Sequence, residues 1–138
     1  MSKVYLALPR AADSYLGSVE ENGKIFRHQV GPDKEIGHVD LADGEVFEKR
    51  FGPDKRIGRV DAQNGRVYLS RLGPDEYVGQ VTPDGKMYRH VSMGADDYIG
   101  SVDRFVSYAH SAGALLLLVL PALEEDTEDT KDPESGTQ

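Results

Sequence analysis

The sequence predicts a mainly β protein, in which antiparallel β-hairpins form a meander of repeated units of about 21 residues, followed by one C-terminal α-helix. Two observations predict the hairpins. Glycine recurs in three columns at spacings of 20 or 21 residues, and runs of β-branched and aromatic residues lie between these glycines. A third observation predicts the helix, because the 19 residues from Phe105 to Leu123 carry no formal charge.

The glycine columns divide the chain into regions. Residues 1–103 are expected to form the β-hairpin repeat domain, with units at residues 10–30, 31–51, 52–72 and 73–93 and a half unit at residues 94–103. Residues 104–123 are expected to form an apolar helix, and residues 124–138 a disordered acidic tail. The N-terminal run MSKVYLALP lacks the long apolar stretch of a signal peptide, so we interpret it as the first strand of a cytoplasmic protein.

Each unit contains two kinds of turn. An Asn-Gly or Asp-Gly pair between strand-like runs favours a two-residue hairpin turn, in which both residues have positive φ. A Gly-Pro-Asp or Gly-Ala-Asp sequence makes the other connection, since Pro presets φ at a turn and Asp accepts hydrogen bonds from the following backbone. The predicted hairpin turns are Asn22-Gly23, Asp43-Gly44, Asn64-Gly65 and Asp84-Gly85.

The glycines inside the strands need a separate explanation, because glycine weakens a strand. They are Gly17, Gly37, Gly58, Gly79 and Gly100. An aromatic residue recurs in the returning strand, and we expect its ring to cover the glycine backbone of the neighbouring strand. These aromatic residues are Phe26, Phe47, Tyr68 and Tyr88. A parallel apolar row is expected from Val19, Val39, Val60, Val81 and Val102.

Four and a half units are too few for a propeller, in which one blade would use two of these units. We therefore expect a solenoid-like stack, a twisted single sheet, or a ring completed by other copies. The segments YLGSVEENGKIF, YVGQVTPDGKMY and YIGSVD, within residues 15–103, resemble MORN-type hairpin repeats. The resemblance implies a single-sheet scaffold that holds proteins or lies near membrane lipids.

The apolar segment is expected to begin after Asp103 as N-cap, and Pro121 is expected to stop or kink the helix. Three interpretations of its leucines remain open: packing against the chain's own sheet, crossing a membrane, or insertion into a partner or second copy. Polar residues in its first half favour the first interpretation. The candidate partner-binding residues are Leu115, Leu116, Leu117, Leu118 and Leu120, together with His38, Arg59 and Gln80, where the repeats differ from one another.

No pattern of reactive residues predicts catalysis. The chain has no cysteine, which excludes disulfides and thiolate metal sites. It also lacks the HExxH, Walker A, dinucleotide-binding and G-x-S-x-G patterns, so we expect no enzyme activity, cofactor, metal or small-molecule substrate. The recurring loop aspartates are explained by turn chemistry rather than by calcium binding.

The formal net charge of −8 is concentrated in the tail, where residues 124–138 hold seven acidic residues and one lysine. Without a basic excess, nucleic acid is not an expected partner. We expect a noncatalytic repeat scaffold that binds a protein partner or a second copy through its sheet face or C-terminal helix. Two alternatives are a membrane-associated protein anchored by residues 105–123, and a carbohydrate- or nucleic-acid-binding module that uses the repeated aromatic rings.

Overall fold

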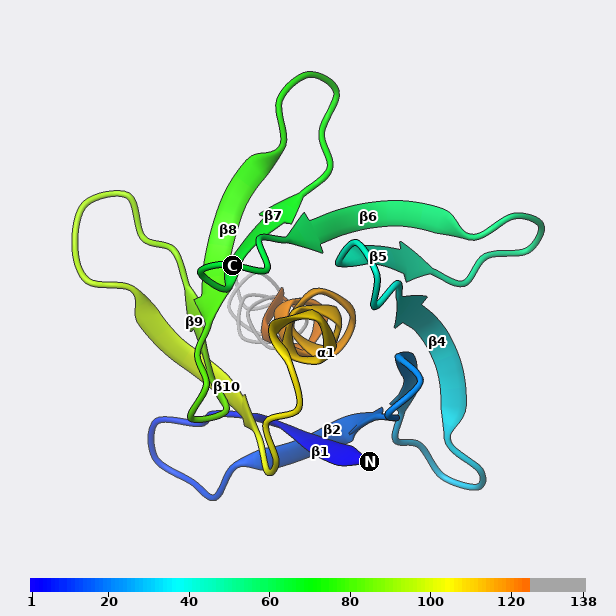
Figure 1. Cartoon of the computed structure of the whole chain (residues 1–138). Coiled ribbons are helices and arrows are strands. Elements are labelled where there is room, and N and C mark those ends of the chain that lie inside the picture. Colours follow the sequence, from blue (N-terminus) through cyan, green and yellow to red (C-terminus); the bar gives the residue numbers. More distant parts are fainter. Residues whose placement is uncertain (125–138) are drawn as a thin grey trace, which may run out of the picture.

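A computed structural model describes residues 1–124, so most of the predicted acidic tail lies outside the described residues. In the described part, antiparallel strands follow one another as a meander and form a closed barrel around a central helix (Figure 1). The strands are β1 (Ser2–Leu6), β2 (Ser14–Val19), β3 (Lys24–Arg27), β4 (Lys34–Val39), β5 (Glu45–Glu48), β6 (Lys55–Val60), β7 (Arg66–Leu69), β8 (Glu76–Val81), β9 (Lys86–Arg89) and β10 (Asp97–Val102). The helix comprises α1 (Tyr108–Ala114) and a π-helical stretch, η1 (Leu115–Val119).

The N-terminal strand closes the barrel. Strand β1 pairs antiparallel with β2 on one side and with β10 on the other, and Val4 lies opposite both Gly17 and Val102. The half unit at residues 94–103 thus receives its second strand from the other end of the repeat domain. The meander and the C-terminal helix are confirmed, whereas the expectation of an open solenoid or a twisted single sheet is wrong. Among the strands of residues 1–124, closure leaves no unpaired edge, so this sheet needs no separate cap.

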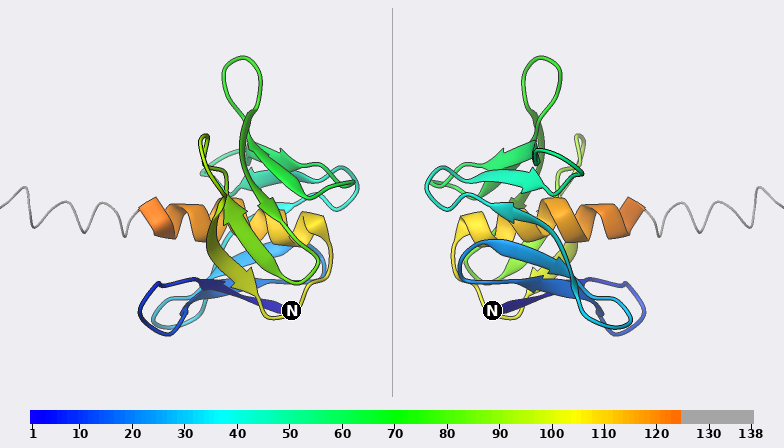
Figure 2. Two further views of the ribbon diagram at one scale, coloured as in Figure 1. Left: turned by 90° about the vertical axis from the view of Figure 1, so that its left-hand side faces the viewer. Right: turned by 90° about the vertical axis from the view of Figure 1, so that its right-hand side faces the viewer.

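The C-terminal helix lies inside the barrel, along its axis (Figures 1 and 2). Residues from His110 to Val119 are all buried. The N-cap is Ser107, whose Oγ accepts a hydrogen bond from the backbone N–H of His110. Asp103, the expected N-cap, instead accepts a hydrogen bond from the backbone N–H of Lys3 in β1 (2.8 Å). The helical conformation continues past Pro121 to residue 124, so this proline does not end the helix.

Four of the five mid-strand glycines face the helix. A Cβ atom at Gly37 would lie 2.7 Å from Leu117 Cδ1, and one at Gly58 would lie 2.7 Å from Leu116 Cδ1. At Gly79 a Cβ atom would lie 3.5 Å from Leu115 Cδ2, and at Gly100 it would lie 3.0 Å from Val119 Cγ1. Because side chains alternate along a strand, the valines two residues later also point inward, and the predicted valine row is buried. The glycines therefore make room for the helix.

The expectation that aromatic rings cover these glycines is wrong. The four rings are only partly buried, and each is flanked in its own strand by a fully buried inward-facing residue. Phe47, for example, pairs with His38, whereas Gly37 pairs with Glu48. Alternation along β4 therefore places the ring of Phe47 and the bare backbone of Gly37 on opposite faces of the barrel wall.

The hairpin turns use one residue with positive φ rather than two. Gly23, Gly44, Gly65 and Gly85 have φ between 76° and 93°, and no other residue type in the described part has positive φ. The Asn or Asp before each glycine instead accepts a hydrogen bond from the backbone N–H two residues later, as Asn22 Oδ1 does from Lys24 (3.0 Å). The side chain thus replaces the backbone contact that the expected turn would supply.

Candidate docking surfaces

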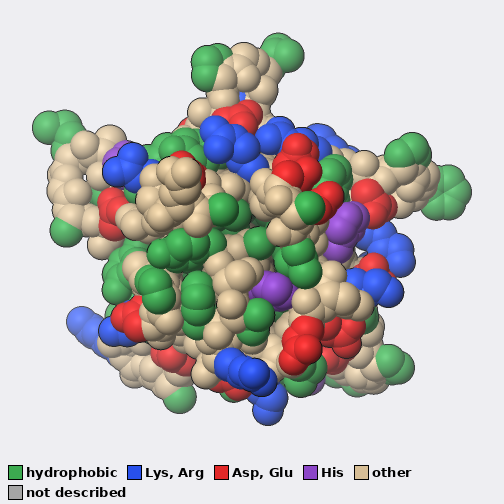
Figure 3. Space-filling model, viewed as in Figure 1, with side chains coloured by type: hydrophobic (Ala, Val, Ile, Leu, Met, Phe, Trp, Pro, Cys, Tyr) green, Lys and Arg blue, Asp and Glu red, His purple; other side chains and the backbone are tan. Residues whose placement is uncertain are grey.

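Five loops project outward from the barrel wall, each from the end of a shorter strand to the start of the next longer one (Figure 1). They are the β1–β2, β3–β4, β5–β6, β7–β8 and β9–β10 loops. In four of them, the residue before the turn glycine is apolar and essentially fully exposed: Val30 (102%), Phe51 (109%), Leu72 (106%) and Met93 (95%). We call these four residues the apolar tips. Hydrophobic side chains are visible at the ends of the projecting loops in Figure 3.

The aspartate of each repeat loop contacts an imidazole or guanidinium group, which belongs to a wall strand for two of the loops and to the same loop for the other two. The pairs are His28 with Asp33 (3.3 Å), His38 with Asp54 (3.6 Å), Arg59 with Asp75 (2.9 Å) and His90 with Asp96 (3.4 Å). The three imidazole rings also pack against aromatic rings of the wall. The four aspartates therefore lie in separate contacts and do not form a cluster. Within residues 1–124, no group of three or more His, Asp or Glu side chains could hold a metal ion.

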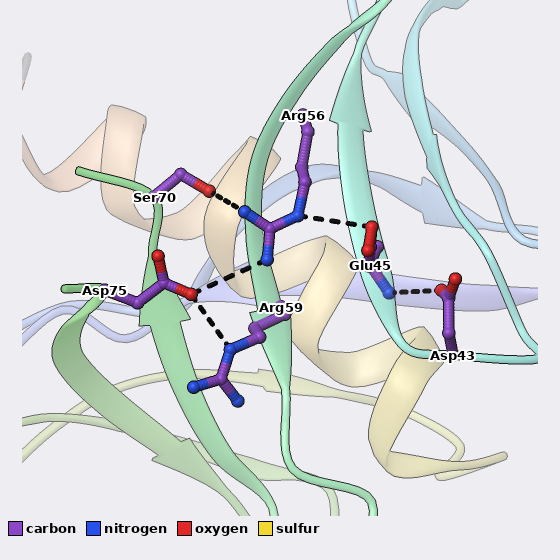
Figure 4. Close-up of polar contacts among 6 residues, drawn as sticks. All are labelled: Asp43, Glu45, Arg56, Arg59, Ser70 and Asp75. Atoms are coloured by element: carbon purple, nitrogen blue, oxygen red, sulfur yellow. Dashed lines mark hydrogen bonds and ion pairs between the residues drawn. The ribbon is translucent and has the colours of Figure 1, made fainter. Parts of the chain in front are cut away.

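The most connected polar group lies on the outer face around Arg56 of β6 (Figure 4). Its guanidinium contacts Glu45 of β5 (3.2 Å), Ser70, and Asp75 in the next loop (3.6 Å). Arg59 donates to the same Asp75 carboxylate and lies over the ring of Tyr68, 4.2 Å from its centroid. Glu45 is oriented in part by its own turn, where its backbone N–H donates to Asp43 Oδ1 (2.9 Å).

This polar group favours a structural role over a catalytic one. The hydrogen bond from Arg59 lowers the pKa of Asp75, partial desolvation opposes this effect, and the charge of Arg56 adds to the lowering. Asp75 is therefore ionised at neutral pH and is not suited to act as a general acid or base there. Its contacts with two arginines hold the β7–β8 loop, which carries Leu72, against the barrel wall.

The predicted partner-binding residues lie in two different environments. Leu115, Leu116, Leu117 and Leu118 are buried inside the chain's own barrel, and Leu120 is partly buried against the same core. Most of the surface of these leucines is therefore covered by the chain's own barrel. His38, Arg59 and Gln80 lie half-buried on the outer face, each opposite an aromatic residue of the neighbouring strand.

Three of the four aromatic rings proposed as a ligand platform already pack against a neighbouring side chain. His38 stacks on Phe47 with centroids 5.0 Å apart, Arg59 covers Tyr68, and Tyr88 packs beside Tyr98 at 5.8 Å. A base or sugar would have to displace these neighbours before it could stack. At these three positions, the carbohydrate- and nucleic-acid-binding alternative would therefore require the neighbouring side chain to move.

The apolar tips were not predicted from the sequence as binding residues. Their signal is present in the sequence as an apolar residue directly before the turn glycine, in VGPD, FGPD, LGPD and MGAD. A turn that projects into solvent normally carries polar residues. The recurrence of an apolar residue in four turns was therefore the observation that could have identified them.

Grooves lie between neighbouring loops at the end of the barrel where the helix ends. The larger has a volume of about 700 Å³ and lies between the β3–β4 and β5–β6 loops. Its floor includes Leu117 and Pro121 of the helix. A groove of about 350 Å³ lies between the β7–β8 and β9–β10 loops, with Leu120 and Glu124 among its lining residues.

Comparison with known proteins identified no relative: no family model matches the chain, and neither the curated proteins nor the solved structures include a significant match. The helices of residues 1–124 include none that combines the length and apolar character needed to cross a membrane.

Proposed function

We propose that the protein is a noncatalytic interaction scaffold, a barrel that presents projecting loops to protein partners or to further copies of itself. The observation that carries this proposal is the set of apolar tips, four fully exposed residues at the same position of four repeats. Single exposed apolar residues need no explanation, but a recurring one at projecting turns does. Burying one such side chain in a partner contributes about 1.5–3 kcal/mol.

The arrangement of the loops supports a multivalent mode of binding. The loops point in different directions around the barrel axis (Figure 1), so the four tips do not form one continuous patch. Separate contacts with several neighbours, or one partner that surrounds the barrel, fit this arrangement. Two tips on neighbouring loops that bind the same partner would also raise each other's effective concentration.

The experiment compares the wild-type chain with a variant in which all four tips are replaced, Val30→Ser, Phe51→Ser, Leu72→Ser and Met93→Ser. The tips make no core contacts. The free energy of unfolding of the variant, measured in urea, should therefore lie within about 0.5 kcal/mol of the wild-type value. Light scattering after size-exclusion chromatography measures self-association. Quantitative affinity purification from cells that make the protein identifies the proteins that bind to it and measures how much of each is captured.

The proposal predicts complexes with the wild type that are lost with the tip variant. A matched control carries the same number of changes on the polar outer face: Lys24→Ser, Lys55→Ser, Arg66→Ser and Lys86→Ser. The proposal would be refuted if the wild type remains a monomer and captures the same proteins as the tip variant. Flotation with vesicles separates protein partners from lipid, because binding of the wild type to vesicles alone would favour membrane association instead. A cytoplasmic location is part of the proposal.

A further inference from the structure

The larger groove is lined by four basic residues, two from each of the loops that flank it. Arg27 and Lys34 come from the hairpin arms of the β3–β4 loop, and Lys49 and Arg50 from the start of the β5–β6 loop. Two acidic residues, Glu35 and Glu48, line it as well, leaving an excess of two positive charges. The remaining lining residues are apolar: Ile36, Phe51, Leu117 and Pro121. We call this site the basic groove.

Arg27 and Lys34 are opposite each other in the register between β3 and β4. Like charges directly opposite in a sheet are destabilising, so an anion bound between these two side chains would relieve their repulsion. Arg50 lies 2.6 Å from Glu48, and Lys49 lies 3.9 Å from Glu35. In the described part of the chain, no carboxylate forms an ion pair with either Arg27 or Lys34. Within residues 1–124, these two charges therefore have no ion-pair partner.

The other repeats provide an internal comparison. The equivalent cross-strand pairs are Glu48 with Lys55, Leu69 with Glu76, and Arg89 with Asp97. None of them places two like charges opposite each other, and Arg89 and Asp97 form an ion pair at 3.1 Å. The smaller groove is balanced, since its formal charges are Arg71, Arg89, Glu76 and Glu124. Two opposed basic residues without an ion-pair partner therefore occur in the unit of Arg27 and Lys34 and are not a general feature of the fold.

We propose that the basic groove is a binding site for an acidic peptide segment, and that its occupant is the acidic segment 125–134 of the same chain. That segment holds six acidic residues and one lysine, the charge that the groove lacks. Leu117 and Pro121 line the groove, so the segment starts about one helical turn beyond the groove floor. Ten residues span up to about 33 Å, and tethering raises the effective concentration to the millimolar range.

Binding in the groove places the acidic segment beside Phe51, one of the apolar tips, because Phe51 lines the groove. The segment would thereby compete with any external anionic peptide for the same cations. The inference stands without the proposed docking function, since it depends only on the charges and location of the groove.

Carbodiimide cross-linking of the full-length chain tests this proposal, because the reagent couples a carboxylate to an amine only when the two are in contact. Mass spectrometry maps which lysines couple to residues 125–134. Lys34 and Lys49 are expected to couple, whereas Lys55, which holds the position of Lys34 in the next unit, should couple at least about fivefold less. The yield at Lys49 should fall about fivefold in an Arg27→Glu, Lys34→Glu variant, and not in a Lys24→Glu, Lys86→Glu control. Raising the salt concentration from 0.05 to 0.5 M should also reduce it.

A second measurement uses the full-length chain with its acidic segment neutralised by Glu125→Gln, Asp126→Asn, Glu128→Gln, Asp129→Asn, Asp132→Asn and Glu134→Gln. A synthetic peptide of residues 121–134 should bind this variant at least about tenfold more tightly than it binds the wild type, whose groove is occupied. Equal affinities, or equal coupling at Lys34, Lys49 and Lys55, would overturn the proposal. Coupling found only in cross-linked dimers would also overturn it, because the segment would then come from a second copy.

Discussion

Replacing Gly58 by alanine tests the close approach of strand β6 to the neighbouring strand β7 and to the central helix. An added Cβ would lie 2.3 Å from the carbonyl oxygen of Tyr68 in the neighbouring strand and 2.7 Å from Leu116 Cδ1 in the helix. Carbon–oxygen contacts in sheets are about 3.3 Å or longer, so the two strands must separate by about 1 Å at this point. The carbonyl belongs to a paired strand and cannot rotate away as a side chain could.

The expected destabilisation is about 3 kcal/mol, the upper part of the range for an overpacked core. Alanine also restricts the unfolded chain more than glycine does, which offsets about 0.5 kcal/mol of this effect. The matched control is Gly73→Ala at a loop turn, where nothing lies within 4 Å of the added atom but φ is +99°. Only backbone strain acts there, so the control should lose about 1 kcal/mol.

Urea unfolding followed by circular dichroism gives both values. With a slope of about 2 kcal/mol per molar urea, the Gly58→Ala midpoint should fall by about 1.3 M and the Gly73→Ala midpoint by about 0.5 M. Equal losses for the two variants would refute the packing explanation, because the free space around the two glycines differs completely. An unchanged Gly58→Ala midpoint would refute it as well.

Three further variants test the helix cap, the barrel closure and the outer-face polar group. Ser107→Ala should cost about 1 kcal/mol in urea unfolding, because the backbone N–H of His110 loses its acceptor, and Ser107→Asp should retain most of the stability. Val4→Thr should cost roughly 2 kcal/mol, because it buries a hydroxyl at a fully buried position where β1 closes the barrel; no loss would contradict the closure. Asp75 has a lowered pKa in the folded state, so its contribution is present above the unfolded pKa and is lost as the pH falls through the folded value. The urea midpoints of wild type and Asp75→Asn should therefore differ at pH 7 and converge well below pH 4, and a difference that does not depend on pH would contradict the interaction with Arg59.

The repeat pattern was sufficient to predict the hairpins, since each turn depends on residues close together in sequence. The same holds for the inward valines, because alternation along a strand is a local rule. Closure was not predictable in this way. It depends on pairing between β1 and β10, about 100 residues apart, and the repeat pattern begins only after β1.

The element that packs against the mid-strand glycines could also not be predicted from neighbouring residues in the sequence. A glycine that accommodates a neighbouring ring and one that accommodates a helix give the same sequence pattern. The difference is decided by the Leu115–Leu120 run, whose location could not be derived from its composition alone. The apolar tips were missed for a different reason. Residues in projecting turns were expected to be polar, and the recurrence of an apolar residue in four turns was the signal.

The central claim is that the chain's own barrel encloses the leucines of the helix. The chain contains no cysteine, so single cysteine substitutions report one position each. The decisive measurement is the rate at which a thiol reagent labels Leu116→Cys in the folded protein, compared with Leu72→Cys at a loop tip. Leu116 is 4% exposed and Leu72 is 106% exposed, so labelling at position 116 should be at least about a hundredfold slower and should rise to the rate at position 72 in urea. Similar rates at the two positions in the folded protein would contradict the enclosed helix.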